Sequence, residues 1–350
     1  MYLKDLVDIQ MGQSPDSKFY NYDKIGLPFY QGKADFGRIN PTPKIWCSKS
    51  KKEAKPNDIL ISVRAPVGDL NINNEQSCIG RGLAAITCRP NVDMMYLYYY
   101  LKYLKPQLKH ISTGSTFESI NRTQLENLII NYKPYFEQIK ISNILQVVER
   151  QIEVKENLLR LYDLLVKSRF VELFGDINHN TKNWPIMTLE DLAELITDGE
   201  HSTPKRCNDG IYLLSARNVL NHSLKLDDVD YIDEAEYDRI SKRVIPKAGD
   251  ILLSCSGSVG RCCITPMEIK FQLVRSVALI RFKSEITPIF AEYMITSDWF
   301  QRQINSLKTA SSQANLFQGK IKKLKGFVPD MNLQYDFIQF VNQINKLKFD

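Results

Sequence analysis

The sequence predicts an α+β protein built from two repeated, mixed β-rich domains, linked by long antiparallel coiled-coil helices with pseudo-two-fold symmetry. Three observations support this fold. Several stretches of the first half recur in the same order in the second half, about 192 residues later. A segment without glycine or proline separates the two copies. A shorter segment with the same apolar spacing follows the second copy.

The repeat is clearest in two short stretches, PNDILISVRAPVGDL at 56–70 and KAGDILLSCSGSVGR at 247–261. Each contains Asp-Ile-Leu, then an apolar residue and a serine, then a Val-Gly pair. Further pairs of stretches match in the same chain order, and they begin near Leu6 and Leu192, near Arg81 and Arg275, and at Tyr96 and Tyr293. Chance explains such an ordered series poorly, and a period this long indicates two copies of one architecture.

We expect each copy to begin with the same elements. A short amphipathic helix from Leu6, or from Leu192, is followed by a polar loop, a Gly-Leu or Gly-Ile step and a strand. Short β-rich runs bounded by turn residues predict further strands at 58–63, 83–88, 250–254 and 274–282. The tyrosines of MMYLYYYLKYL at 94–104 fall at helical spacing among leucines, which favours a core helix over a base-stacking surface.

Residues 136–172 contain no glycine and no proline, and they predict one helix of about 36 residues, or about 54 Å. One heptad stripe, interrupted by Lys155, consists of Ile141, Leu145, Val148, Ile152, Leu159, Tyr162 and Val166. A second stripe beside it consists of Ile144, Val147, Val154, Leu158, Leu161 and Leu165. One stripe suffices for a helix of the same chain, so the second predicts a surface for another protein. The alternative is a helix buried within one domain, and its many charged residues argue against it.

A second helix of about 18 residues is predicted at the end of the chain, from the spacing of Phe337, Phe340, Val341, Ile344 and Leu347. At about 27 Å it can cover about half of the first helix. Internal two-fold symmetry requires the two helices to be antiparallel. We therefore expect two equivalent domains at a fixed separation, which suits a bipartite site along a polymer.

These elements divide the chain into four parts. The boundaries that we predict are 1–133 for the first β-rich domain, 134–176 for the central helix, 177–328 for the second β-rich domain and 329–350 for a short or truncated C-terminal helix.

The composition limits the classes of protein to which the chain can belong. The chain has 350 residues, 43% of them hydrophobic and 25% charged, which is enough for two folded domains. Its net charge of +6 is a mild bias toward an anionic partner. Seven cysteines without a Cys-x-x-Cys pair favour a reducing cytoplasmic setting. No apolar run has the length of a membrane span and no secretion signal is visible, so we expect no membrane association.

The sequence contains no catalytic motif that we consider credible. A Gly-x-x-x-x-Gly-Lys phosphate loop and a Gly-x-Ser-x-Gly elbow are both absent, and the four histidines lack metal-ligand spacing. Asp16 with Glu53 and Lys55 imitates the carboxylate–lysine set of a nuclease. The spacing is long, however, and the second copy has Ile245 where the first has Glu53. We therefore predict no catalytic residues, no metal and no cofactor on this chain.

Basic and amide side chains at loop-like positions form the predicted binding surface. Arginine clamps phosphates and reads guanine, whereas Asn and Gln read adenine. The candidates are Gln31, Lys33, Arg38, Arg64, Arg81, Lys205, Arg206, Arg217, Asn218, Arg261, Arg275 and Gln313. For any one of them an ordinary solvated charge is the alternative. Arg81 and Arg275 stand out because both precede an apolar strand at equivalent positions of the repeat.

Residues 112–176 contain several motifs in series: a Ser/Gly-rich turn, INRTQLENL, a proline followed by Glu137-Gln138, the long helix, and KSRFVELFGD. As a set these motifs resemble the central region of type I restriction–modification specificity subunits, and the resemblance extends through both repeats. It implies two target recognition domains, each of which reads one half of an interrupted DNA sequence, with the helices spanning the unread spacer.

The resemblance also implies partners for the chain. Double-stranded DNA would be bound together with modification subunits, which bind S-adenosylmethionine and methylate adenine, and with restriction subunits, which use ATP and Mg²⁺. The base-reading loops differ between members of the family, so no contact residue can be transferred from it. Two alternatives stay open: a specificity subunit of another multi-subunit methyltransferase system, and a coiled-coil scaffold that does not bind DNA. A self-sufficient methyltransferase or nuclease is disfavoured by the missing motifs.

Overall fold

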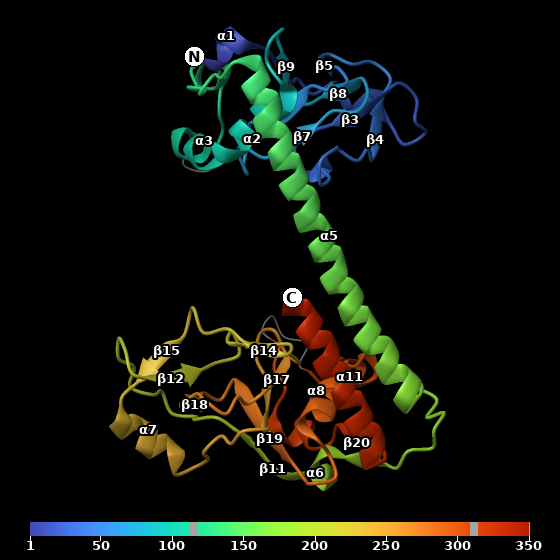
Figure 1. Cartoon of the computed structure of the whole chain (residues 1–350), viewed down its shortest axis with the longest axis vertical. Helices are drawn as coiled ribbons and strands as arrows, with labels where there is room; N and C mark the ends of the chain where they lie inside the picture. The colour runs from blue at the N-terminus through green and yellow to red at the C-terminus, as the bar shows by residue number, and fades with distance from the viewer. Residues whose placement is uncertain (113–117, 309–313, 350) are drawn as a thin grey trace. The chain divides into compact units, whose positions relative to one another are not determined.

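The computed structural model describes residues 1–112, 118–308 and 314–349 (Figure 1). The chain divides into two compact units, unit 1 from Met1 to Lys155 and unit 2 from Glu156 to Asp350. Each unit is described by itself below. Within the described residues, no helix is both long and apolar enough to span a bilayer.

Unit 1 contains two sheets. The first is an antiparallel sheet with strand order β1-β9-β6-β7: β1 (Val7–Met11), β9 (Leu83–Cys88), β6 (Ile59–Ser62) and β7 (Leu70–Ile72). The second has the order β2-β4-β3-β8-β5: β2 (Tyr20–Asn21), β4 (Ile45–Cys47), β3 (Leu27–Tyr30), β8 (Ser77–Ile79) and β5 (Glu53–Ala54). In that sheet β3 and β8 are parallel.

Unit 1 also contains several helices. They are α1 (Leu3–Leu6), α2 (Met94–Tyr103), α3 (Lys105–Ile111), α4 (Arg122–Glu126) and the first part of α5 (Tyr135–Phe174). Two short 3-10 helices lie at Ser17–Phe19 and Lys33–Asp35. Leu97 and Leu101 of α2 pack against Ile59 and Ile61 in the main core of the unit, so the aromatic helix is a core helix, as predicted.

Unit 2 repeats the first sheet and adds smaller ones. The repeated sheet has the order β11-β19-β16-β17: β11 (Ala193–Asp198), β19 (Val277–Phe282), β16 (Ile251–Ser254) and β17 (Cys262–Ile264). The other strands pair as β15-β12-β18, β13-β14 and β10-β20: β15 (Asp230–Ile232), β12 (Ile211–Leu214), β18 (Phe271–Leu273), β13 (Val219–Leu220), β14 (Ser223–Leu224), β10 (Ile186–Thr188) and β20 (Lys325–Phe327).

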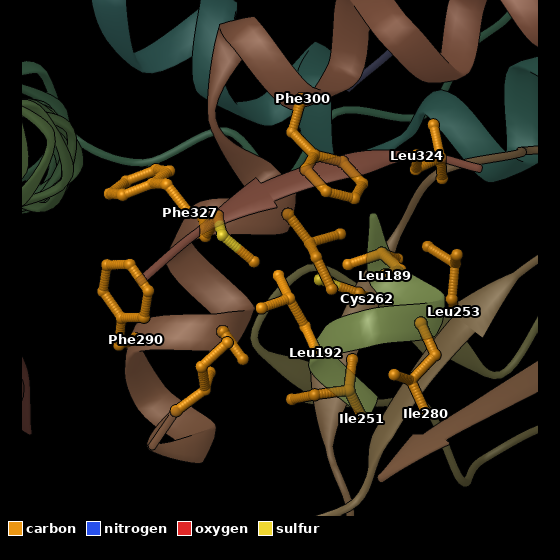
Figure 2. Packing of buried hydrophobic residues seen from close by; sticks show 14 of the residues in the cluster. Leu189, Leu192, Ile251, Leu253, Cys262, Ile280, Phe290, Phe300, Leu324 and Phe327 are labelled. Atoms are coloured by element: carbon orange, nitrogen blue, oxygen red, sulfur yellow. The ribbon is translucent and has the colours of Figure 1, made fainter. Parts of the chain in front are cut away.

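The helices of unit 2 are α6 (Leu189–Leu192), α7 (Glu234–Ser241), α8 (Pro288–Thr296), α9 (Asp298–Leu307), α10 (Gln318–Ile321) and α11 (Met331–Phe349). Figure 2 shows how Phe290 of α8, Phe300 of α9 and Phe327 of β20 gather around the sheet residues of the core. Aromatic side chains of this kind bury a large apolar area each, and all three are fully buried here.

The two units confirm the predicted repeat. Their main sheets have the same strand order, and the central pairs have the same register: Ile59 faces Ile86 in unit 1, and Ile251 faces Ile280 in unit 2. A buried glutamine also recurs. Gln138 Oε1 accepts from Asp93 N at 2.9 Å, and Gln334 Oε1 accepts from Thr287 N at 2.9 Å. Each glutamine fixes the first turn of a helix, α5 or α11, against its unit.

The repeated Asp-Ile-Leu stretches are core strands with a tight turn beyond them. Ser62 Oγ donates to Pro66 O at 2.7 Å and accepts from Asp69 N at 2.9 Å. Ser254 forms the same pair of bonds with Ser258 and Arg261. Gly68 and Gly260 close the two turns at φ +87° and +96°, a conformation in which glycine has no steric cost.

The predicted helices from Leu6 and from Leu192 are wrong in position. Helices α1 and α6 end at Leu6 and Leu192, and the residues that follow are strands β1 and β11. In β1 the side chains alternate, with Val7 and Ile9 buried and Asp8 and Gln10 exposed. That alternation has the period of two that a strand requires, and pairing with β9 satisfies the backbone.

The long helix and the C-terminal helix were predicted well. Helix α5 has 40 residues and α11 has 19. Within unit 2 the end of α5 and α11 are antiparallel, because Phe337 packs near Phe174 while Lys348, further along α11, reaches back to Asp163. Phe170 and Phe174 are buried with Phe290 and Phe337, so this end of α5 belongs to a core.

Candidate nucleic-acid interface

Two loops of unit 1 meet beside the ends of its central strands. Arg64 follows β6, and Arg81 precedes β9. Val63 N donates to Gly82 O at 2.9 Å, which places the two arginine-bearing segments next to each other. A Cβ atom on Gly82 would collide with the carbonyl oxygen of Gln31, so the close approach of a third loop requires glycine here.

Two more segments complete this edge of unit 1. Ser14 Oγ accepts from Arg81 N at 3.2 Å, and Ser119 forms an isolated bridge with Arg64. Ile120 N donates to Val63 O at 2.9 Å and ties the segment after α3 to the same strand end. We call the set Ser14, Arg64, Arg81 and Ser119 the unit 1 edge.

Unit 2 has the same construction. Cys255 N donates to Ser276 O at 2.7 Å, and Arg275 N donates to Glu200 O at 3.0 Å. Ser256 forms a bridge with Asn315 and donates from Oγ to Asn315 Oδ1 at 2.6 Å. The counterpart set, His201, Ser256, Arg275 and Asn315, is called the unit 2 edge.

The unit 2 edge surrounds a cavity of about 350 Å³. Its lining mixes polar and apolar side chains and includes the exposed Phe317; the residues are Asp198, His201, Cys255, Ser256, Arg275, Asn315, Leu316, Phe317, Gln318 and Ile321. Asp198 Oδ2 lies 2.8 Å from His201 Nε2 and its Oδ1 accepts from Arg243 at 2.5 Å, so its charge is already compensated. A hydrogen bond from Ser202 is the main cause that lowers the pKa of the neighbouring Glu200.

Three of the residues in the two edges are exposed arginines. Arg64, Arg81 and Arg275 are exposed, and within the described residues none of their guanidinium groups forms an ion pair. Guanidinium presents a planar fork of donors that suits phosphate and carboxylate oxygens and the guanine edge. These three arginines can therefore contact an anionic polymer without first leaving a carboxylate partner among the described residues.

Several other predicted cations are already paired. Lys33 lies 3.1 Å from Asp69, and Arg38 lies 3.2 Å from Glu153. Arg206 and Arg217 both contact Asp230, each at 3.0 Å. Their side chains are still about half exposed, but each would have to share or exchange its carboxylate partner to hold a phosphate.

Asn218 is the clearest correction among the predicted contacts. It is fully buried, its Oδ1 accepts from Ser215 N, and its Nδ2 donates to the carbonyls of Lys225 and Asp228. These bonds use the whole amide to hold a turn, so Asn218 has no group free to read a base.

The structure leaves the remaining predicted contacts in different settings. Gln31 and Lys205 have exposed side chains, and Arg261 is half-buried with its backbone N bonded to Ser254 Oγ. Gln313 lies outside the described residues. Sequence reasoning missed Ser14, Ser119, His201 and Asn315. Their signal is their offset within the repeat rather than their charge, which is why a search for basic residues did not find them.

Apolar side chains are exposed along the middle of α5. The exposed fractions of the predicted second stripe are 56% for Ile144, 59% for Val147, 54% for Val154, 55% for Leu161 and 46% for Leu165, and Leu158 is half-buried. The predicted first stripe is also exposed at Leu145, Val148, Ile152 and Leu159, and it becomes fully buried only at Val166. The rest of the chain therefore covers a shorter length of α5 than predicted, and the exposed apolar surface of the helix is larger.

Comparison with known families identifies the chain. The family model described as the type I restriction modification DNA specificity domain matches residues 1–160 and again residues 181–349. The chain belongs to this family. The two matched regions coincide with the two copies of the repeat, and the predicted resemblance is confirmed.

Specificity subunits are also among the most similar individual proteins. A putative type I restriction enzyme MjaX specificity subunit of Methanocaldococcus jannaschii is 45% identical over 148 residues, 42% of this chain and 35% of that protein. The MjaIX specificity subunit of the same organism is 24% identical over 310 residues, 79% of this chain and 71% of that protein. In the first match the chain thus spans about a third of its relative's length.

A solved structure shares the fold over nearly the whole chain. The crystal structure of the type I restriction-modification system S subunit from M. genitalium matches with a TM-score of 0.59, at 17% identity, and covers 99% of this chain and 89% of that chain. At this identity the likeness concerns the fold alone. It confirms the predicted α+β architecture with its repeated domains.

Proposed function

We propose that this protein is the DNA sequence-specificity subunit of a type I restriction–modification complex. Its two specificity domains each recognise one half of a bipartite target, and the chain itself carries out no chemistry. The observation that carries the proposal is the duplicated edge: at the same place in the same sheet, each unit presents an exposed arginine that has no ion pair with any residue the structure describes. Because the chain belongs to the DNA specificity family, DNA is the ligand in this proposal.

The catalytic steps belong to partner subunits in this proposal. Modification subunits bring S-adenosylmethionine, and restriction subunits bring ATP and Mg²⁺. Among the described residues of this chain, no group of three or more His, Cys, Asp or Glu side chains could hold a metal ion. The exposed second stripe of α5 supports a protein partner, because contiguous apolar surface of this kind is characteristic of interaction sites.

Helix α5 begins in unit 1 and ends in unit 2, and we propose that it sets the length of the unread spacer between the two half-sites. A helix rises about 1.5 Å per residue, whereas DNA rises about 3.4 Å per base pair. Inserting one helical turn, four residues, near Lys155 should therefore lengthen the preferred spacer by one or two base pairs.

Selection from a random DNA library tests the proposal. The chain is assembled with its modification subunit, and bound sequences are enriched and read. We expect two short fixed blocks separated by a spacer of constant length, with affinity that falls steeply as salt rises. Enrichment of one continuous block, or of no sequence at all, would contradict it. The four-residue insertion is the internal test, since it should change the spacer and leave both blocks unaltered.

A further inference from the structure

The two edges can be compared position by position because the same backbone hydrogen bonds build both. Gly12 N donates to Leu83 O, and Gly199 N donates to Val277 O. Ile120 N donates to Val63 O, and Leu316 N donates to Cys255 O. This framework makes Arg81 equivalent to Arg275, Arg64 to Ser256, Ser119 to Asn315 and Ser14 to His201.

One position is the same in both edges and three are different. Arg81 and Arg275 are both exposed arginines without an ion pair within the described residues. At the other three positions, Arg64 of unit 1 corresponds to Ser256 of unit 2, Ser119 corresponds to Asn315, and Ser14 corresponds to His201. The side chains thus differ in charge, size and hydrogen-bonding groups at the positions that surround an identical arginine.

The two half-sites of a DNA target likewise have features that are the same in both and features that differ between them. The phosphates are chemically identical in every sequence, whereas the base edges in the major groove differ. A residue that is the same in two domains with different target sequences can contact the phosphates, which both targets share. A residue that differs between the domains can contact the base edges, which distinguish the targets.

We infer that Arg81 and Arg275 each bind a backbone phosphate, one in each half-site, and that the positions that differ beside them, Ser119 and Asn315 above all, contact the bases. This division of roles rests on the proposed DNA specificity function and deepens it. The arginine clamp fixes how each domain sits on the duplex. Asn315, which lines the unit 2 cavity and whose Oδ1 accepts from Ser256 Oγ, then presents its side-chain amide to a base edge.

The salt dependence of binding separates the two roles. The chain is assembled with its modification subunit, and Kd is measured from 50 to 200 mM salt on the selected target and on targets with single base changes. Arg81→Ala and Arg275→Ala should each weaken binding roughly tenfold on every sequence and reduce the salt slope by about one. Arg81→Lys, which keeps a point charge, should restore most of the slope.

Variants of the differing positions should behave in the opposite way. Asn315→Ala should lower discrimination at one base pair of a single half-site by about tenfold and leave the salt slope unchanged. Arg89 and Lys283 provide matched controls. Each is a cation that follows the same strand, β9 or β19, whose start is next to Arg81 or Arg275. Arg89 is paired with Asp8 at 2.7 Å, and Lys283 donates to Asp191 O at 2.5 Å. Their alanine variants should retain the wild-type slope and affinity.

Two results would overturn the inference while leaving the proposed function intact. In the first, Arg81→Ala or Arg275→Ala changes the base preference of one half-site. In the second, both variants retain the wild-type salt slope. If instead the wild-type complex shows no bipartite preference, the proposed function itself fails and the inference fails with it. Because both arginines are exposed, thermal unfolding of the variants should match the wild type and exclude misfolding as the cause.

Discussion

The Nζ atom of Lys348 lies 2.7 Å from Oδ1 of Asp163, near the end of α11 and within the second half of α5. Further along the pair, the ring of Phe337 lies 5.4 Å from that of Phe170 and 5.6 Å from that of Phe174. The two helices are therefore antiparallel in unit 2. An ion pair between a partly buried lysine and an exposed aspartate marks one end of their contact, and a buried aromatic cluster marks the other.

The aromatic end of this contact should dominate its energy. Replacing the fully buried Phe337 by alanine opens a cavity and should lower the free energy of unfolding of unit 2 by about 3–5 kcal/mol. Lys348→Ala removes an ion pair whose Asp163 side chain is 65% exposed and should cost less than about 1 kcal/mol. Urea unfolding of both variants measures the difference. Equal losses would show that the aromatic cluster does not stabilise the helix pair.

The aspartates of the repeated Asp-Ile-Leu stretches should differ in their importance. Asp250 is buried and forms two 2.7 Å hydrogen bonds with Arg281, whereas Asp58 is buried and accepts from Thr87 Oγ1 at the equivalent place. Asp250→Ala leaves a half-buried guanidinium without its partner and should cost about 3–5 kcal/mol. Asp58→Ala removes hydrogen bonds from neutral donors, the Thr87 hydroxyl and the Lys55 backbone N–H, and should cost about 1–3 kcal/mol. Denaturant unfolding of the two variants compares them, and a larger loss for Asp58→Ala would contradict this account.

Glu236 should make unit 2 sensitive to acid. The hydrogen bond from Arg239 is the main cause that lowers the pKa of this carboxyl group, which is 7% exposed. A carboxyl whose folded pKa is lowered stabilises the protein above its unfolded pKa, about 4.3 for glutamate. That stability is lost as pH falls through the folded value. The gap in unfolding free energy between wild type and Glu236→Gln should therefore narrow below about pH 4. If the difference in unfolding free energy between wild type and Glu236→Gln stayed constant from pH 7 to pH 3, the ionised carboxylate would not be what stabilises unit 2.

Under the proposed function, the exposed second stripe of α5 should carry the association with a modification subunit. Val154→Gln and Leu161→Gln should each weaken that association about tenfold or more, because buried apolar anchors dominate interfaces. Stability should be unaffected, since both side chains are more than half exposed. Arg150→Gln, an exposed change on the same helix, is the control for calorimetric titration. If all three variants bound the modification subunit with wild-type affinity, its binding site would lie elsewhere on the chain.

The repeat, the long helix and the antiparallel end helix could be predicted because each depends on a pattern along the chain. Apolar spacing identifies α5 without knowledge of its neighbours, and the offset between Asp58 and Asp250 identifies the two copies. The strands at β1 and β11 were missed because four residues of helix precede them, and a short apolar run does not distinguish the two states.

The candidate site was predicted only in part, since a charge in the sequence does not show what compensates it. Lys33 and Arg217 were chosen for the same reason as Arg81, but tertiary contacts give them carboxylate partners that lie 36 and 13 residues away. Asn218 has the right chemistry for adenine and is used instead to hold a buried turn. Ser119 and Asn315 become visible only when the backbone bonds beside them are compared between the units.

Methylation profiling shows directly which DNA sequence the two units recognise. The chain is expressed with its modification subunit in a host that lacks other adenine methylation, and every methylated site in the genome is read. We expect one bipartite motif with a spacer of fixed length. When residues 180–326 are exchanged for those of another specificity chain, only one half of this motif should change. A continuous motif, a change in both halves on exchange, or no methylation above the host background would contradict this expectation.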